Sequence, residues 1–299
     1  MKKLYVFVFL TILLHSASAV YAGNRNQHRV MTCNIRITGL EADAGKPGRP
    51  WEERRDLCAD VIRSYNPDII CMQEVIYDSY DYMKSRFKDY FVFGFSGPEM
   101  DPYEDGYHFI GKNVIFFKKS RYDFVSAGNY WLSETPLVAG SCSWETNRAR
   151  HCNWVRIRDR RTGQEFRVLD VHLDHKSEEA RCCQSHMIVE ESAQYADDFP
   201  QILCGDFNAG LDQKAVTTVK NAGWTDAYEA LHTPEQEVTT CHLFMGENRK
   251  VKKVKRIDFI FFRGNINVKQ SSIVKDSRNG IYPSDHYFVL ADLEINSKN

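Results

Sequence analysis

A short apolar run, residues 200–204, that ends abruptly at Gly205 constrains the fold of this chain more than any other feature. Its length and composition, with Pro200 at its start, predict a buried strand. A strand that stops at a glycine places the following side chains at the carboxyl edge of a sheet, where open α/β folds build their sites. Asp206 and Asn208 follow, two residues apart on one face of an extended chain. We therefore expect Asp206 and Asn208 to handle a water molecule beside a phosphate.

Other strand-like runs also end in an acid, an amide or a histidine, where a buried core would favour an apolar residue. These residues are Asn34, Glu74, His172, Asp258, Asp285 and His286. Burial of such groups without partners is costly, so their recurrence beside buried runs indicates that they converge on one site.

The chemistry of these side chains divides into two kinds. Glu74, Asp285 and the amide oxygen of Asn34 are hard oxygen donors that suit Mg²⁺ or Mn²⁺ rather than zinc. His172 and His286 can donate a proton to a phosphate oxygen or to a leaving group. We expect Asp206 to orient or deprotonate the attacking water, a combination typical of metal-assisted phosphoester hydrolysis.

Asp258 and His286 are expected to pair. A carboxylate beside a histidine fixes the tautomer of the ring and stabilises the imidazolium form. No glycine-rich phosphate loop is present, so kinase or ATPase chemistry has no support in the sequence.

The hydrophobic pattern predicts one α/β domain. A strand at His28–Ile37, a helix at Glu52–Tyr65 and a strand at Asp68–Glu74 form a unit that places two strands in parallel. Further helices are expected at Ser79–Phe87, Ser177–Ala196 and Gln213–Asn221. Further strands are expected at Tyr90–Phe95, Asn113–Phe117, Phe124–Leu132, Trp154–Arg158, Glu165–Leu173, Arg256–Phe262, Ile266–Val274 and Tyr287–Ile295.

The first 22 residues have the pattern of a secretory signal peptide. Lys2 and Lys3 precede a short apolar run, and small residues follow it, with cleavage expected after Ala22 or Ala19. We therefore expect residues 23–299 to form an exported monomer without a stable membrane anchor. The net charge of −1 does not indicate a general nucleic-acid binder, so any attraction for polyanions must be local.

Nine cysteines are present, and export would permit disulfides between them. Cys142 and Cys152 are the pair we favour, whereas Cys71 and Cys204 lie inside apolar runs and are expected to be buried thiols. No cysteine or histidine spacing resembles that of a zinc site.

The motifs, taken in order, resemble those of the endonuclease/exonuclease/phosphatase superfamily, the deoxyribonuclease-like phosphoesterases. They are Thr32-Cys33-Asn34-Ile35-Arg36, Met72-Gln73-Glu74, Val171-His172-Leu173-Asp174-His175, Gly205-Asp206-Phe207-Asn208, Arg256-Ile257-Asp258-Phe259 and Ser284-Asp285-His286. Residues 131–136, and Arg150 before Trp154, resemble a secreted bacterial branch of that superfamily.

The resemblance implies a four-layer α/β sandwich of two packed mixed sheets flanked by helices, with the site at one end. It implies that Glu74 is the principal metal ligand, supported by Asn34 and Asp285. It further implies roles for the remaining residues. In this scheme Asp206 activates water, Asn208 holds Asp206 and the phosphate, His286 with Asp258 stabilises the phosphorane or assists the leaving oxygen, and His172 contacts the scissile phosphate.

Two positions depart from the pattern of the superfamily. Arg36 stands where many of its nucleases carry an acid. Relatives also often carry a Glu near Gly111, which can support the His in the place of His172, whereas this sequence has Ile110-Gly111-Lys112. Asp174 is a candidate to replace that support.

Basic side chains supply the remaining candidates for substrate binding. Lys252 and Arg256 share the strand face of Asp258, and Arg148 and Arg150 are candidates to reach an anion. The alternative for the basic run 248–256 is an exposed loop or a lysine-protected edge strand.

The sequence therefore predicts an exported, Mg²⁺-dependent phosphoesterase (Mn²⁺ also suits the ligands) that hydrolyses a phosphodiester, with nucleic acid as the first choice of substrate. Alternatives are a phosphatase or phosphodiesterase on small phosphorylated molecules or phospholipid headgroups, and a binding module that retains a phosphate site without catalysis.

Overall fold

Two mixed β-sheets pack face to face in the computed structural model, which describes residues 25–95, 110–146, 148–251, 253 and 255–296. The expected signal peptide, Lys252 and most of the loop between Gly94 and Gly111 lie outside the described residues. The first sheet has six strands in the order β11 (Ile266–Val274), β12 (Phe288–Ile295), β1 (Gln27–Asn34), β2 (Ile69–Val75), β4 (Lys112–Lys118) and β3 (Tyr90–Phe93).

The second sheet also has six strands, in the order β5 (Tyr122–Trp131), β6 (His151–Asp159), β7 (Glu165–His172), β8 (Gln201–Asp206), β10 (Asp258–Arg263) and β9 (Thr225–Asp226). The expected strands are therefore present with ends shifted by a few residues. One further strand, β9, is present without having been expected, because a segment of two residues is too short to show a hydrophobic pattern.

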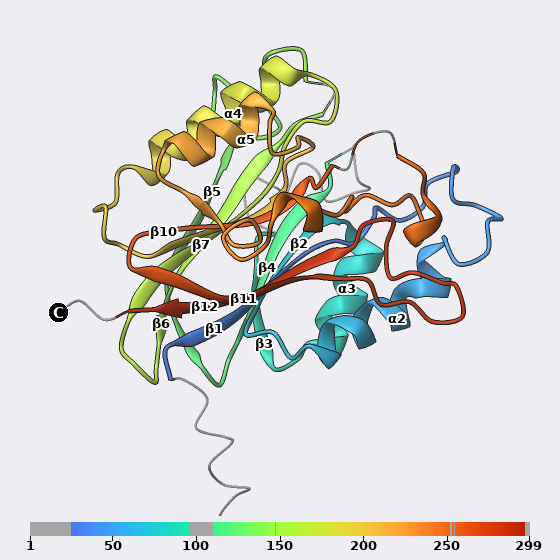
Figure 1. Cartoon of the computed structure of the whole chain (residues 1–299), viewed down its shortest axis with the longest axis horizontal. Coiled ribbons are helices and arrows are strands. Elements are labelled where there is room, and N and C mark those ends of the chain that lie inside the picture. Colours follow the sequence, from blue (N-terminus) through green and yellow to red (C-terminus); the bar gives the residue numbers. More distant parts are fainter. Residues whose placement is uncertain (1–24, 96–109, 147, 252, 254, 297–299) are drawn as a thin grey trace, which may run out of the picture.

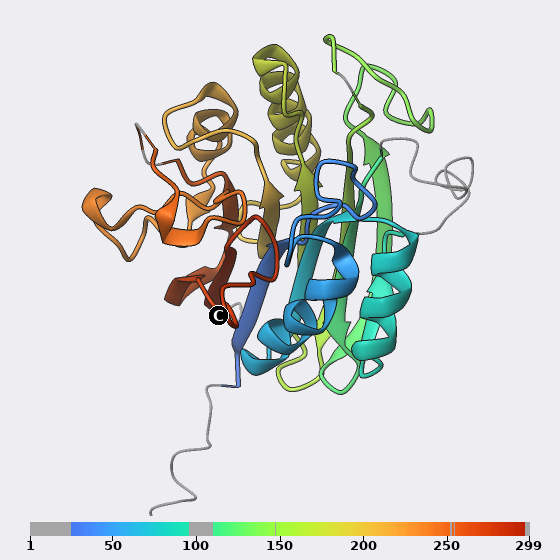
Figure 2. The same cartoon turned by 90° about the vertical axis from the view of Figure 1, so that its right-hand side faces the viewer.

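Helices cover the outer face of each sheet (Figures 1 and 2). On the first sheet lie α2 (Trp51–Ser64) and α3 (Tyr77–Arg86), and on the second lie α4 (Glu178–Ser192) and α5 (Lys214–Asn221). Two short 3₁₀ helices, η2 (Pro234–Gln236) and η3 (Gly246–Asn248), lie in the segment before β10. The result is the predicted four-layer α/β sandwich.

Apolar side chains fill three layers between these elements. The central layer joins the sheets through β-branched residues and phenylalanines such as Ile69, Ile115, Val168 and Phe166, all without exposed surface. Polar contacts also cross this interface; in one of them Gln73 Nε2 donates to Asp170 Oδ1 at 2.6 Å. Buried polar groups need such partners, and this one links β2 to β7 directly beside Glu74.

Parallel pairs of strands bring the polar strand ends to one edge of the sandwich. β1 and β2 run parallel, as the strand–helix–strand pattern predicts, and β7 and β8 do so in the second sheet. In the second pair His172 lies opposite Asp206, and Asp206 also lies opposite Asp258 of the antiparallel β10. Asp206 is thus the residue on which the ends of three strands converge.

All nine cysteines lie in the described residues and are free thiols, so the expected bond between Cys142 and Cys152 is absent. Cys142 is exposed in a loop, whereas Cys152 is buried in β6. Cys71 and Cys204 are buried in β2 and β8, as predicted. Of the helices in the described part of the chain, none is long and apolar enough to cross a membrane.

Replacing Gly205 by Ala should destabilise the fold by about 3 kcal/mol or more. Gly205 has φ +147°, and a Cβ there would lie 2.0 Å from the carbonyl oxygen of Val171 in β7. Chemical denaturation should show the loss. Gly163→Ala is the matched control, because Gly163 also has positive φ but open space around it, so only strain of about 1 kcal/mol is expected. Equal losses in the two variants would contradict this account.

Candidate active site

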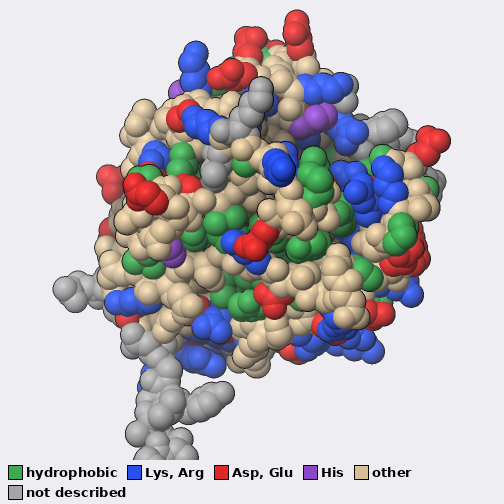
Figure 3. Space-filling view, turned by 45° about the vertical axis from the view of Figure 1, so that its right-hand side comes forward, with side chains coloured by type: hydrophobic (Ala, Val, Ile, Leu, Met, Phe, Trp, Pro, Cys, Tyr) green, Lys and Arg blue, Asp and Glu red, His purple; other side chains and the backbone are tan. Residues whose placement is uncertain are grey.

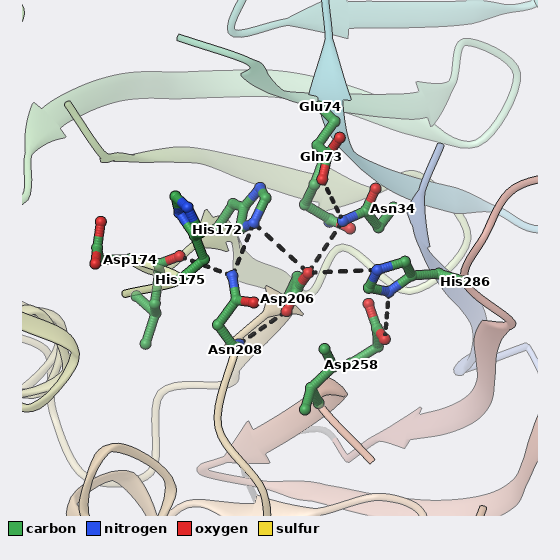
Figure 4. A network of polar contacts seen from close by, with 12 residues as sticks. Asn34, Gln73, Glu74, His172, Asp174, His175, Asp206, Asn208, Asp258 and His286 are labelled. Carbon is green, nitrogen blue, oxygen red and sulfur yellow. Dashed lines mark hydrogen bonds and ion pairs between the residues drawn. The ribbon is translucent and has the colours of Figure 1, made fainter. Parts of the chain in front are cut away.

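A pocket of about 280 Å³ opens at the edge where the polar strand ends meet. Its walls include Glu74, His172, Asp206, Asn208, Asp285 and His286, together with Arg36, Arg148, Arg150, His175 and Cys241. Most of the residues that the sequence singles out as one site are therefore neighbours in space, although up to 212 residues separate them along the chain, from Glu74 to His286. Figure 4 shows part of this group, with Glu74, His172, Asp206, Asn208 and His286 labelled.

Asp206 lies at the centre of the network. Its Oδ2 accepts a hydrogen bond from Asn34 Nδ2 at 3.0 Å and lies 3.5 Å from His172 Nε2 and 4.0 Å from His286 Nε2 (Figure 4). Its Oδ1 accepts the backbone N–H of Asn208 at 2.8 Å. Burial and the nearby charge of Asp258 raise the pKa of Asp206 to about 7. A carboxylate with a pKa near neutrality is suited to taking a proton from water.

Asn208 contacts both Asp206 and His172. Its backbone adopts φ +49°, a conformation that asparagine tolerates better than most residues. Its side-chain amide donates to the carbonyl oxygen of Leu173 and lies 3.0 Å from His172 Nε2. Burial and the positive charge of Arg150 lower the pKa of His172 well below its usual value, so this ring is neutral at physiological pH.

His286 has the opposite electrostatics. Its Nδ1 lies 2.9 Å from Asp258 Oδ2. Burial alone would lower the pKa of His286, but the charge of Asp258 outweighs it and raises that pKa well above 6.5. The expected acid–histidine pair is therefore formed, and it keeps His286 as an imidazolium that can donate a proton.

Glu74 projects from the end of β2 at a point where the strand bulges. Its φ is +64°, and the pairing register with β4 shifts between Met72 and Val75. Burial would raise the pKa of Glu74, but hydrogen bonds from the Asn34 amide and the Ile37 N–H, with the charges of His286 and Arg36, outweigh burial and lower it. Glu74 is therefore a carboxylate at neutral pH.

Gly111 explains how this bulge is accommodated. A Cβ on Gly111 would lie 2.8 Å from the Cα of Glu74. Glycine at position 111 thus permits close approach of the two backbones. Asp174 does not support His172: its Oδ1 accepts the backbone N–H groups of Lys176 and Ser177, and neither its Oδ2 nor His172 Nδ1 has a hydrogen-bond partner among the described residues.

The chain provides oxygen ligands for a divalent cation at this pocket. Glu74 and Asp285 both line it, and burial raises the pKa of Asp285, which indicates an acid whose charged form lacks solvation. A cation between such carboxylates would offset that burial, and hard oxygen donors suit Mg²⁺. Asn34 is placed differently from the expectation: its amide nitrogen faces Glu74 and Asp206, and its oxygen accepts the Arg36 N–H.

Arg150 also lines the pocket. Its side chain is buried, its Nη2 lies 3.3 Å from His175 Nδ1, and it forms no ion pair with any residue that the structure describes. Burial lowers the pKa of Arg150 despite the attraction of Asp174, Glu74 and Asp206. A buried guanidinium without a carboxylate partner is costly, which is consistent with a site that receives an anion.

Arg36 is a site residue whose role the sequence pattern does not reveal. With φ +62° it turns the chain after β1, so that its guanidinium returns to the pocket. There it lies 3.3 Å from Asp285 Oδ2 and 3.0 Å from Asp43 Oδ2. The only signal in the sequence is the replacement of an acid by Arg at this position.

The structure does not bring Arg256 to the pocket, and the expectation that it binds substrate is corrected. Its guanidinium is buried between Asp226 of β9 and Glu237 after η2, with Nη2 2.5 Å from Asp226 Oδ2 and 3.0 Å from Glu237 Oε1. Strand parity places Arg256 on the face of Asp258, but the pattern gives no sign of the acids that enclose it.

Arg256→Met should therefore lower stability rather than substrate affinity. Removal of one partner of a buried ion pair leaves Asp226 unpaired, which should reduce the free energy of unfolding by about 3–5 kcal/mol. Urea denaturation measures this. Lys253→Met is the control, since its pair with Asp212 is exposed and the midpoint should hardly move. A raised KM at unchanged stability would restore Arg256 as a substrate ligand.

The two-sheet sandwich and the acids and histidines at its edge define a class of protein, the deoxyribonuclease-like α/β sandwiches. A family model described as "Endonuclease/Exonuclease/phosphatase family" matches residues 31–286. The chain belongs to this family, whose members are hydrolases that act on phosphodiesters or phosphate esters and depend on divalent metals.

Solved structures and curated proteins agree with this membership. An endonuclease/exonuclease/phosphatase from Bacteroides vulgatus aligns with a TM-score of 0.77 and 26% identity, covering 90% of this chain and 99% of that one. A mannosyl-6-phosphatase from Bacteroides thetaiotaomicron also gives a TM-score of 0.77 and 26% identity, covering 89% and 99%. Human nocturnin is 25% identical over 83% of this chain, which spans 59% of nocturnin's length.

Proposed function

We propose that this protein is an exported, Mg²⁺-dependent phosphatase that hydrolyses a phosphate monoester of a small polar molecule. The observation that carries the proposal is the buried Arg150, which lines the pocket together with its acids and has no carboxylate partner among the described residues. Arg148 and His175 line the same wall. A terminal phosphate, which carries two negative charges, would pair with the Arg150 guanidinium more strongly than a diester, which carries one.

The size of the pocket supports a small substrate. Its volume of about 280 Å³ lies just below the range of roughly 300–1,000 Å³ that is typical of ligand sites. The structural neighbour described as a mannosyl-6-phosphatase is consistent with a sugar-sized leaving group.

The first choice of substrate from the sequence is a phosphodiester in nucleic acid, and its main support is the basic run 248–256. The structure weakens that support. Arg256 is internal, and Lys253 is paired with Asp212. On the face shown in Figure 3, basic and acidic side chains are interspersed rather than segregated. That face therefore lacks a continuous positive surface along which a long polyanion could bind.

The residues of the pocket divide the chemistry among themselves. Asp206 takes a proton from the attacking water, and Asn208 and Asn34 hold its carboxylate in place. Arg150 holds the phosphate, and the imidazolium of His286 donates a proton to a phosphate oxygen or the leaving oxygen. Glu74 and Asp285 would hold the cation, which when bound polarises a phosphoryl oxygen.

A substrate panel tests the proposal. Purified protein with Mg²⁺ should release phosphate from mannose 6-phosphate or another sugar phosphate much faster than it cleaves an oligonucleotide or bis-p-nitrophenyl phosphate at equal phosphate concentration. Sphingomyelin and inositol phosphates belong in the same panel. Efficient cleavage of DNA or RNA without monoester hydrolysis would contradict the proposal and restore the diester hypothesis.

A further inference from the structure

Cys241 introduces a soft ligand into a pocket whose other metal-binding groups are hard oxygens. Its thiol lines the pocket, and its sulfur, a carboxylate oxygen of Asp285 and a ring nitrogen of His286 lie within 4.8 Å of one another. The proposed phosphatase chemistry gives this thiol no task. A cluster of sulfur, nitrogen and oxygen donors is the kind of ligand set that zinc prefers over magnesium.

The backbone holds Cys241 firmly against His286. The two residues form an antiparallel β-bridge, which places their side chains directly opposite each other. On either side of Cys241, the Tyr287 N–H donates to the Thr240 carbonyl at 2.9 Å and the His242 N–H donates to the Asp285 carbonyl at 2.7 Å. The position of the thiol is therefore a fixed property of the fold rather than of a loose loop.

His286 is already arranged as a metal ligand would be. Its Nδ1 is engaged by Asp258 Oδ2 at 2.9 Å, which leaves Nε2 directed into the pocket. Histidines that bind metals commonly donate their other ring N–H to a carboxylate in this way. Asp285 is the third donor, with Arg36 Nη1 3.3 Å from its Oδ2.

The spacing of the three donors needs only a small adjustment. Zinc bonds of about 2.0–2.3 Å place the ligands of a tetrahedral site about 3.5 Å apart. Donor atoms that already lie within 4.8 Å of one another can reach that separation by rotation of the side chains, and water would complete the coordination.

We propose that Cys241, His286 and Asp285 form a zinc site that inhibits the enzyme. Zinc bound there displaces one proton from the Cys241 thiol and one from the His286 nitrogen that faces the substrate, and both protons pass to solvent. It also removes Asp285 from the magnesium site. The inhibitory part rests on the proposed function, whereas the binding part does not. The protein would therefore hydrolyse phosphate esters in magnesium and be silenced when zinc, cadmium or another soft divalent cation is present.

Cobalt substitution tests the binding part without any assay of activity. Co²⁺ added to the metal-free protein should produce a near-ultraviolet thiolate-to-cobalt charge-transfer band, and zinc should displace it. The band should be lost in Cys241→Ser, whose affinity for zinc should fall by about 10-fold or more. It should persist in Cys142→Ser and Cys183→Ser, which remove thiols elsewhere. Circular dichroism checks that each variant is folded.

Zinc titration of phosphatase activity in excess magnesium tests the inhibitory part. The zinc concentration that halves activity should rise by about 10-fold or more in Cys241→Ser and stay unchanged in Cys142→Ser. A cobalt band that survives in folded Cys241→Ser would overturn the proposed site. If no phosphate ester is hydrolysed at all, the proposed function fails while the cobalt spectrum still decides the metal site.

Discussion

Asp206→Asn is expected to lower kcat by about 10³-fold while leaving the fold intact. The substitution preserves the shape of the side chain, and the amide oxygen can still accept the Asn208 N–H that now reaches Oδ1. It removes the group that we propose takes the proton from water, a carboxylate whose pKa burial raises to about 7. KM should change little, because in the proposed mechanism Arg150 and not Asp206 holds the ground-state phosphate.

Asp170→Asn is a suitable control for that variant. Asp170 is another buried acid, which lies between the two sheets and does not line the pocket, and burial raises its pKa well above the usual range. An amide therefore replaces a neutral acid, so turnover should stay close to that of the parent protein. If Asp206→Asn retained full turnover, water activation would have to be assigned to another residue.

Glu74→Gln is expected to raise the Mg²⁺ concentration needed for half-maximal activity by about 100-fold or more. Loss of even an outer partner of a metal ligand weakens binding by roughly 10–100-fold, and Glu74 is expected to contact the ion itself. Asn34 and the Ile37 N–H each donate to a different oxygen of Glu74, so the single oxygen of the new amide can keep only one of these two hydrogen bonds in place. Activity should recover partly at high Mg²⁺, which a purely structural defect would not show.

The matching control is Glu165→Gln. Glu165 lies on β7 at the opposite end of the strand from His172 and pairs with Arg156 and Arg158 near the surface. The Mg²⁺ concentration that gives half-maximal activity should be the same for Glu165→Gln as for the parent protein. An unchanged Mg²⁺ dependence in Glu74→Gln would remove Glu74 from the metal site.

Much of the site could be predicted because its residues interrupt strong local patterns. Asp206, Asn208, Glu74 and His286 each adjoin an apolar run, and a polar group in that place has few structural explanations. The alternation of strands and helices then fixes which edge of the sheets they share. These are properties of short segments, which a sequence shows directly.

The errors concern contacts made by segments without a pattern. Arg256 is enclosed by Asp226, in a strand of two residues, and by Glu237, in a loop. Arg36 returns to the site through a backbone turn with positive φ. Cys241 reaches His286 through one isolated bridge, although 45 positions separate them in the sequence. Periodicity and residue spacing carry no information about such tertiary contacts.

The most direct test of the central claim is the rate of phosphate release from p-nitrophenyl phosphate with Mg²⁺, before and after addition of EDTA. We predict steady hydrolysis in Mg²⁺ or Mn²⁺, complete loss with EDTA, and recovery when the cation is restored in excess. Hydrolysis that continues unchanged in EDTA would contradict a metal-dependent site. Absence of hydrolysis of this and every other phosphate ester would instead indicate a module that binds phosphate without catalysis.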